Sequence, residues 1–364
     1  MTITFAEKLA RMPGYKAGVP TGQAPEAIAS GRIAQLASNE SPLPPHPKVV
    51  EAISKAASVM HRYPDPDATL LRRRLAERYE AEPGRIAVGN GSCDILLAAA
   101  EALCEPGDEI LYAWPAFSMY PYLPALTGAR EIRVPLAEGD VHDLDAMAAE
   151  VTAATQLLIV CNPNNPTATH IPAAEIATFL ERIPSRVTVI LDEAYVEFQT
   201  HDDPDASLDL LDDFPNLVVL RTFSKCYGLA GLRVGYAIGS AGFRAAVDAV
   251  RQPFSVNALA QAAGAEAILH QDDVLRRIEG TVAARLTVEE GLHGLGLRTS
   301  DSQTNFSWVD LGEADEDAIV AGLGERDIAV RPGKALGGPG HIRVSYGTPE
   351  ENDRFLRGLS ELLD

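Results

Sequence analysis

Positive charge and cysteine are both scarce in this sequence. Lysine and arginine together number 31, against 51 aspartate and glutamate residues, which gives a formal net charge of −20. A surface this acidic repels polyanions, so nucleic acid and anionic membranes are not expected as partners. The four cysteines, Cys93, Cys104, Cys161 and Cys226, form no C-x-x-C pair. Neither a metal site nor a disulfide framework is therefore predicted, and a reducing compartment is expected.

Long apolar segments are missing as well. No run of 18 or more apolar residues occurs, and the N-terminal stretch has no apolar core of the kind that signal peptides carry. With 46% hydrophobic and 23% charged residues, the composition is that of an ordinary globular protein. A chain of 364 residues is long enough for two packed domains, or for one large domain with an appendage. We expect a cytoplasmic protein of the size of an enzyme.

Strand-like and helix-like segments alternate between residues 85 and 239. Short apolar runs typical of buried strands are separated by helical stretches, and these runs are residues 86–88, 109–112, 157–160, 187–191 and 217–220. Alternation of this kind predicts an α/β fold, in which a mostly parallel sheet is flanked by helices on both faces.

The two ends of the chain have a different pattern. From about residue 297 come strand-like pieces and a closing helix at 350–363, which predict a smaller α+β domain. We expect the N-terminal segment to complete it. The predicted division is residues 1–40 for that N-terminal segment, 41–255 for the large domain and 256–364 for the small C-terminal domain.

Two polar motifs directly follow apolar strands. In DEAY (192–195), a carboxylate stands at the end of a strand, where α/β proteins bind ligands, although such acids also serve as helix caps. In NPNNPT (162–167), two X-Pro steps force a turn and fix the directions of the side-chain amides. A plain polar loop would have the same composition. Each motif alone is therefore weak support for a site.

Two further motifs suggest an anion site and a reactive amine. VGNGSCD (88–94) joins a strand to a helix, and free amides at such a helix start attract phosphate; the stretch matches neither a Walker loop nor the dinucleotide fingerprint. Lys225 follows a buried strand beside Ser224, where loss of hydration would lower its pKa and make it nucleophilic. A lone lysine is more often a solvated surface charge.

Taken together and in this order, the motifs resemble the fold-type I pyridoxal-phosphate (PLP) aminotransferases, in particular the histidinol-phosphate aminotransferase family. Nearly the whole chain takes part, because LASNESP (36–42), HRYPDPD (61–67), RTFSKCYGLAGLR (221–233), VRPG (330–333) and IRVSYGT (342–348) also match. One departure is Ala168, where the family has glycine. The resemblance implies PLP as the cofactor and a large PLP-binding domain with a sheet of the seven-stranded type.

The resemblance also implies roles for the residues around the cofactor. Lys225 is expected to form the Schiff base with PLP and to move the substrate proton, and Asp192 to pair with the pyridine nitrogen. Asn165 and Tyr195 are expected to bond the ring oxygen, and Phe117 to stack on the ring. Ser92, the amide of Cys93, Ser224 and Arg233 are expected to hold the phosphate, and Gly91 and Thr222 are also expected to bind the cofactor. Tyr63 is expected to reach this phosphate from the other subunit, which implies a homodimer with shared active sites.

For the substrates, a small amino donor and a 2-oxo acid acceptor, the resemblance implies two arginines. Arg343 is expected to clamp the substrate α-carboxylate through its planar fork, and Arg331 to meet a distal phosphate. Asn39, Asn305 and Tyr15 are candidates for the pocket wall, or equally for buried polar groups bonded to backbone.

The leading substrate pair is histidinol phosphate with 2-oxoglutarate. The lysine motif and PEENDRFLR (349–357) are also similar to aromatic amino-acid aminotransferases, so phenylalanine-like donors remain open. A PLP lyase or synthase would share the lysine, the aspartate and the phosphate site. A PLP-binding regulator is not favoured, because no basic extension is present.

Overall fold

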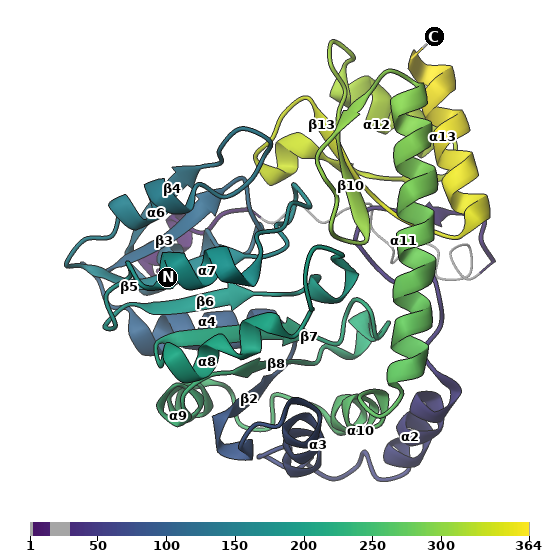
Figure 1. Ribbon diagram of the computed structural model, residues 1–364. Coiled ribbons are helices and arrows are strands. Elements are labelled where there is room, and N and C mark those ends of the chain that lie inside the picture. The colour runs from purple at the N-terminus through teal and green to yellow at the C-terminus, as the bar shows by residue number, and fades with distance from the viewer. Residues whose placement is uncertain (1–2, 15–29, 364) are drawn as a thin grey trace.

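The computed structural model describes residues 3–14 and 30–363, and a large seven-stranded sheet lies at its centre (Figure 1). The strand order is β2-β8-β7-β6-β5-β3-β4, and only β8 runs antiparallel to its neighbours. The strands are β2 (Ile86–Gly89), β3 (Glu109–Trp114), β4 (Arg130–Pro135), β5 (Thr155–Cys161), β6 (Thr188–Asp192), β7 (Leu217–Thr222) and β8 (Gly235–Ile238). The predicted α/β class with a mostly parallel sheet is confirmed.

The apolar runs form these strands because both faces of the sheet are covered. In β5, Leu158 and Val160 pack into one core, while Leu157 and Ile159 pack into a second core on the opposite face. Side chains alternate between the faces of a strand, so a strand buried on both sides needs a continuous apolar run.

Helices cover the two faces of the sheet. One core contains side chains of α4 (Ser92–Leu103), α5 (Tyr122–Thr127) and α9 (Ala241–Val250). The other core contains side chains of α2 (Pro47–Ala57), α3 (Thr69–Tyr79), α6 (Leu144–Ala149), α7 (Ala173–Leu180), α8 (Leu210–Asp213) and α10 (Ala258–Ala267). Short 3-10 turns connect the elements at Glu7–Ala10, Pro83–Arg85, Val196–Phe198, Ala206–Leu208, Ala230–Leu232 and Gly333–Leu336.

A second, antiparallel sheet forms near the C-terminus, with the order β12-β13-β10-β9. Its strands are β9 (Arg298–Thr299), β10 (Phe306–Asp310), β12 (Arg331–Pro332) and β13 (His341–Ser345), and it packs with α12 (Glu316–Glu325) and α13 (Pro349–Leu363) in a separate core. The strand β1 (Ala34–Gln35) pairs in parallel with β11 (Ile328–Ala329). The N-terminal segment thus joins the C-terminal part of the chain, as the sequence predicts.

The long helix α11 (Gln271–Gly294) runs between the two regions (Figure 1). Val256, Ala260 and Val274 belong to the same core as the large sheet, whereas Val288 and Leu292 belong to the core of the smaller one. We propose that the chain passes from one domain to the other within α11. The predicted boundary between residues 255 and 256 stays a prediction. In the described part of the chain, no helix has the length and apolarity needed to cross a membrane.

Candidate active site

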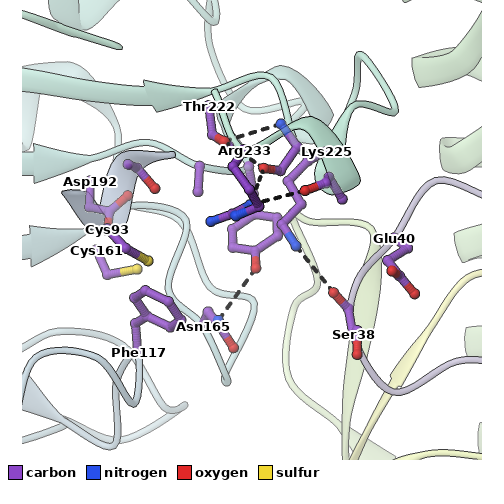
Figure 2. Close-up of a pocket in the computed structure, with 15 residues that line it drawn as sticks. Ser38, Glu40, Cys93, Phe117, Cys161, Asn165, Asp192, Thr222, Lys225 and Arg233 are labelled. Atoms are coloured by element: carbon purple, nitrogen blue, oxygen red, sulfur yellow. Dashed lines mark hydrogen bonds between the residues drawn. The ribbon is translucent and has the colours of Figure 1, made fainter. Parts of the chain in front are cut away.

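The motifs found in the sequence meet in one cavity at the carboxyl ends of the parallel strands (Figure 2). Cys161, Asp192 and Thr222 are the last residues of the adjacent strands β5, β6 and β7. Because parallel strands all end at the same edge of a sheet, these three residues come together there. The cavity is lined by Ser38, Glu40, Ser92, Cys93, Phe117, Cys161, Asn165, Asp192, Ala194, Tyr195, Thr222, Ser224, Lys225, Ala230 and Arg233.

Lys225 points into this cavity from the turn after β7. Its Nζ donates a hydrogen bond to the carbonyl oxygen of Ser38, at 3.1 Å. Burial, together with the nearby guanidinium groups of Arg343 and Arg233, lowers the pKa of Lys225 to about 8. A larger fraction of the amine is therefore neutral, and hence nucleophilic, near pH 7 than for an ordinary lysine.

Asp192 is buried at the end of β6, with 2% of its surface exposed. Its Oδ2 accepts a hydrogen bond from the Tyr120 hydroxyl at 2.8 Å, whereas its buried Oδ1 has no partner among the described residues. Burial raises the pKa of Asp192 to about 6, although the Tyr120 hydroxyl and the backbone N–H of Ala194 act in the opposite direction. A carboxylate oxygen that is buried and unpaired suits a cationic N–H group of a ligand, such as a protonated ring nitrogen.

A candidate anion site, the anion cup, lies beside Lys225 and consists of the start of α4 with Thr222, Ser224 and Arg233. Gly91 has φ of +80° just before α4, and a Cβ atom at this position would lie 2.5 Å from Nη2 of Arg233. Arg233 Nη1 donates to Ser224 Oγ at 3.4 Å, and Thr222 Oγ1 donates to the same oxygen at 3.0 Å. The amides at the start of α4, these hydroxyls and one guanidinium match the groups that bind phosphate in proteins.

Asn165 and Tyr195 also line the cavity. Asn165 Nδ2 donates to the Tyr195 hydroxyl at 3.3 Å, and Arg343 Nη1 donates to Asn165 Oδ1 at 2.5 Å. Arg343 Nη2 donates to the Ala37 carbonyl oxygen at 2.7 Å. Phe117 supplies an aromatic ring to the cavity wall. With an amine, an unpaired carboxylate oxygen, an aromatic ring and an anion cup around one cavity, the residues fit PLP.

Some predicted residues lie elsewhere. Tyr63 is 82% exposed and stacks on Phe254, with the ring centroids 4.6 Å apart, so it does not line the cavity of its own chain. Arg331 is buried directly opposite Arg343 in the β12–β13 pair, and neither arginine is among the described residues that line the cavity. The predicted Tyr15 lies outside the described residues.

Asn39 and Asn305 are not among the described residues that line the cavity, but Asn39 bonds the lining residue Tyr195 and Asn305 bonds Asn39. Asn39 Nδ2 donates to the Tyr195 hydroxyl at 3.0 Å, and Asn305 Nδ2 donates to the Asn39 carbonyl oxygen at 3.2 Å. Both are at least 97% buried. Their predicted role as pocket wall stays a prediction.

Sequence reasoning missed Tyr120 and Ser38. Tyr120 bonds Asp192, and its position three residues after Phe117 in the same aromatic stretch was the available signal. Ser38 lies inside the LASNESP motif but contributes its backbone carbonyl, which no side-chain pattern reveals.

Comparison with known proteins agrees with this geometry. The family described as "Aminotransferase class I and II" matches residues 32–359. An aromatic amino acid aminotransferase from Streptomyces coelicolor is 41% identical over 97% of this chain and 96% of its own length. Histidinol-phosphate aminotransferase 2 from Pseudomonas aeruginosa is 43% identical, over 91% of this chain and 89% of its own.

A solved structure is also similar along the whole chain. The crystal structure of histidinol-phosphate aminotransferase from Sinorhizobium meliloti in complex with pyridoxal-5'-phosphate superposes with a TM-score of 0.86 at 29% identity, over 100% of this chain and 98% of that one. The chain therefore belongs to the class I and II aminotransferases, and its cofactor is PLP.

Proposed function

We propose that this aminotransferase moves the amino group of an aromatic L-amino acid to a 2-oxo acid such as 2-oxoglutarate, with Lys225 as its catalytic lysine. One observation carries the assignment of roles: Lys225 and the unpaired carboxylate oxygen of Asp192 border the same cavity, and the anion cup at Arg233 borders it too. When bound, PLP supplies a carbonyl that condenses with amines and a ring that takes up electron density.

The residues of the chain then divide the work. Lys225 holds the cofactor covalently and moves the proton at the substrate Cα, because its lowered pKa leaves a larger neutral fraction of the amine near pH 7 than an ordinary lysine has. Asp192 keeps the ring nitrogen protonated through its unpaired oxygen. The cup at Arg233, with Ser92, Cys93 and Ser224, holds the phosphate. Tyr195 and Asn165 hold the ring oxygen.

Two buried arginines support an anionic substrate. Arg331 and Arg343 are direct partners in the antiparallel β12–β13 pair, so their side chains leave the same face of the sheet. Arg343 also bonds Asn165, which places its guanidinium next to the proposed cofactor site. We propose that Arg343 receives the α-carboxylate of an amino acid, and that Arg331 receives the second carboxylate of 2-oxoglutarate.

Histidinol phosphate is the second candidate donor. The adjacent arginines favour it, since two guanidinium groups suit a phosphate dianion. This donor has no carboxylate, so Arg343 and Arg331 would both face its phosphate, and the expectation that Arg343 clamps an α-carboxylate does not extend to it. The aromatic assignment is placed first because the relative from Streptomyces coelicolor has that name at similar identity over a larger share of both chains.

The test compares phenylalanine, tyrosine and histidinol phosphate as donors in single-turnover half-reactions, in which no 2-oxo acid takes part. We expect the aromatic amino acids to react with the higher efficiency. Arg343→Ala should lower that efficiency by roughly 30- to 1000-fold, which corresponds to about 2–4 kcal/mol for a charge-assisted bidentate contact. In the second half-reaction, which consumes the 2-oxo acid, Arg331→Ala should lower the efficiency with 2-oxoglutarate far more than it lowers the efficiency with phenylalanine in the first. If the wild-type protein reacted more efficiently with histidinol phosphate than with the aromatic amino acids, histidinol phosphate would become the proposed donor.

We also propose that the protein is a homodimer in which Tyr63 completes the partner's phosphate site. Large apolar side chains are exposed around the turn that contains Tyr63, which supports this arrangement. They are Val59 (53% exposed), Met60 (70%), Leu70 (47%) and Phe254 (38%). Exposed apolar groups gathered in this way are typical of protein–protein contacts.

A further inference from the structure

The hydroxyl of Tyr195 receives two amide donors. Asn39 Nδ2 lies 3.0 Å from this oxygen and Asn165 Nδ2 lies 3.3 Å from it. Tyr195 is only 4% exposed, and among residues 3–14 and 30–363 no group accepts its proton. A phenol oxygen accepts at most two hydrogen bonds and donates one, so both acceptor positions are filled.

The orientation of Asn165 follows from its other partner, and the contacts of Asn39 with Ser345 agree with the same orientation for Asn39. Arg343 has only donors, so the atom of Asn165 that faces it at 2.5 Å is the oxygen. The Ser345 hydroxyl accepts from the backbone N–H of Asn39 at 2.8 Å and donates to Asn39 Oδ1 at 3.1 Å. Each amide therefore turns its NH₂ group toward Tyr195, and the phenol proton is left to point into the cavity, which Tyr195 lines.

We propose that Asn39 is a positioning residue of the aminotransferase site, which fixes the Tyr195 hydroxyl as a donor toward the ring oxygen of PLP. The inference rests on the proposed role of Tyr195. Asn165 is itself expected to bond the ring oxygen, so Asn39 is the donor that stays on Tyr195 once the cofactor is bound. Burial raises the pKa of Tyr195 to about 12, so the phenol keeps its proton at neutral pH.

The position of Asn39 depends on the smaller sheet. Ser345 belongs to β13 and lies two residues from Arg343, so both side chains leave the same face of that strand. Asn305, just before β10, holds the Asn39 carbonyl oxygen at 3.2 Å. Asn39 itself has φ of +53°, a left-handed conformation that asparagine tolerates better than most residues. The strand face that presents Arg343 to the substrate thus also orients the hydroxyl that faces the cofactor.

The test is a double-mutant cycle on the dissociation constant of PLP, measured by equilibrium dialysis on the PLP-free full-length protein. Asn39→Gly removes the amide and accepts the positive φ, so the backbone is kept. It should weaken PLP binding about 3- to 10-fold, the size of one hydrogen bond. In a Tyr195→Phe background, Asn39→Gly should alter the dissociation constant of PLP by less than about 2-fold, because Asn39 acts on the cofactor only through the Tyr195 hydroxyl.

A second variant, Asn39→Asp, and the visible absorbance of the PLP-loaded protein distinguish the proposed role of Asn39 from a purely structural one. Asn39→Asp keeps the shape but offers an acceptor, which draws the Tyr195 proton away from the cavity, so it should weaken PLP binding more than Asn39→Gly. In the PLP-loaded protein, Asn39→Gly should move the pH midpoint of the visible absorbance upward, and this shift should vanish in the Tyr195→Phe background.

One result would contradict the proposed role of Asn39, and a different result would contradict the proposed role of Tyr195. Additive losses in the two backgrounds would show that Asn39 acts without Tyr195, which overturns the inference. If Tyr195→Phe alone left the PLP affinity unchanged, the proposed role of Tyr195 would be wrong, and the inference would fall with it.

Discussion

In the absence of PLP, the buried carboxylate of Asp192, with one oxygen unpaired, should destabilise the protein. The pKa of Asp192 is about 6, against an ordinary value of 3.8, because burial disfavours its charged form. The folded protein therefore binds this proton more tightly than the unfolded chain does, and folded stability falls as the pH rises from about 4 to about 6. A difference of about two pKa units corresponds to about 3 kcal/mol, all of it lost above pH 6.

Asp192→Asn removes the charge and keeps the shape, and its side chain still accepts from Tyr120. The PLP-free variant should be more stable than PLP-free wild type by up to about 3 kcal/mol at pH 7.5, and the gap should shrink below about 1 kcal/mol near pH 4. Thermal melts of the two proteins at several pH values would measure this, since a gap of that size shifts the melting temperature by several degrees. Saturation with PLP should close or reverse the gap, because the ring nitrogen pairs with Asp192.

Glu193 provides the matched control. It is the neighbouring buried carboxylate, but its Oε2 accepts from Arg221 Nε at 2.9 Å. Glu193→Gln removes a charged partner from a buried guanidinium and should destabilise the protein with or without PLP. If Asp192→Asn were no more stable than wild type at pH 7.5, or if both variants behaved alike, the reasoning from the unpaired oxygen would be refuted.

Three further predictions concern the lysine and the assembly. Lys225→Ala should lose transamination by several orders of magnitude, and borohydride reduction of the wild type should fix PLP on residue 225; label on another lysine, found by peptide mass, would contradict this. The pKa of Lys225 is lowered to about 8, so the rate of PLP attachment should rise about tenfold per pH unit below that pH and level off above it. A rate that kept rising to pH 10 would exclude a lowered pKa. Mixing Tyr63→Ala with Lys225→Ala should restore part of the activity through hybrid dimers, and a fully active monomer in sedimentation would rule this out.

Much of the site could be predicted from the sequence because it lies at strand ends. The apolar runs located β5, β6 and β7, and parallel strands bring their carboxyl ends to one edge, so Asn165, Asp192 and Lys225 had to meet. The glycines before α4 likewise marked the anion cup.

Other features depend on contacts that the sequence does not encode locally. The carbonyl oxygens of Ala37 and Ser38 approach the site, and a backbone group leaves no trace in the residue pattern. That Arg331 lies opposite Arg343 depends on the register of two short strands. The membership of α10 in the core of the large sheet could not be predicted either, since an alanine-rich helix packs equally well on either domain.

The carbonyl oxygens of Ala37 and Ser38 have a consequence for selectivity. Each already accepts from a basic side chain, Arg343 and Lys225 respectively, so a ligand that takes the place of either carbonyl oxygen exchanges one hydrogen bond for another. A neutral carbonyl on a ligand gains almost nothing in such an exchange, because it replaces an acceptor of its own kind. A carboxylate or phosphate gains from its charge, since charge-assisted bonds are about twice as strong. The backbone thus favours anionic over neutral ligands at Arg343.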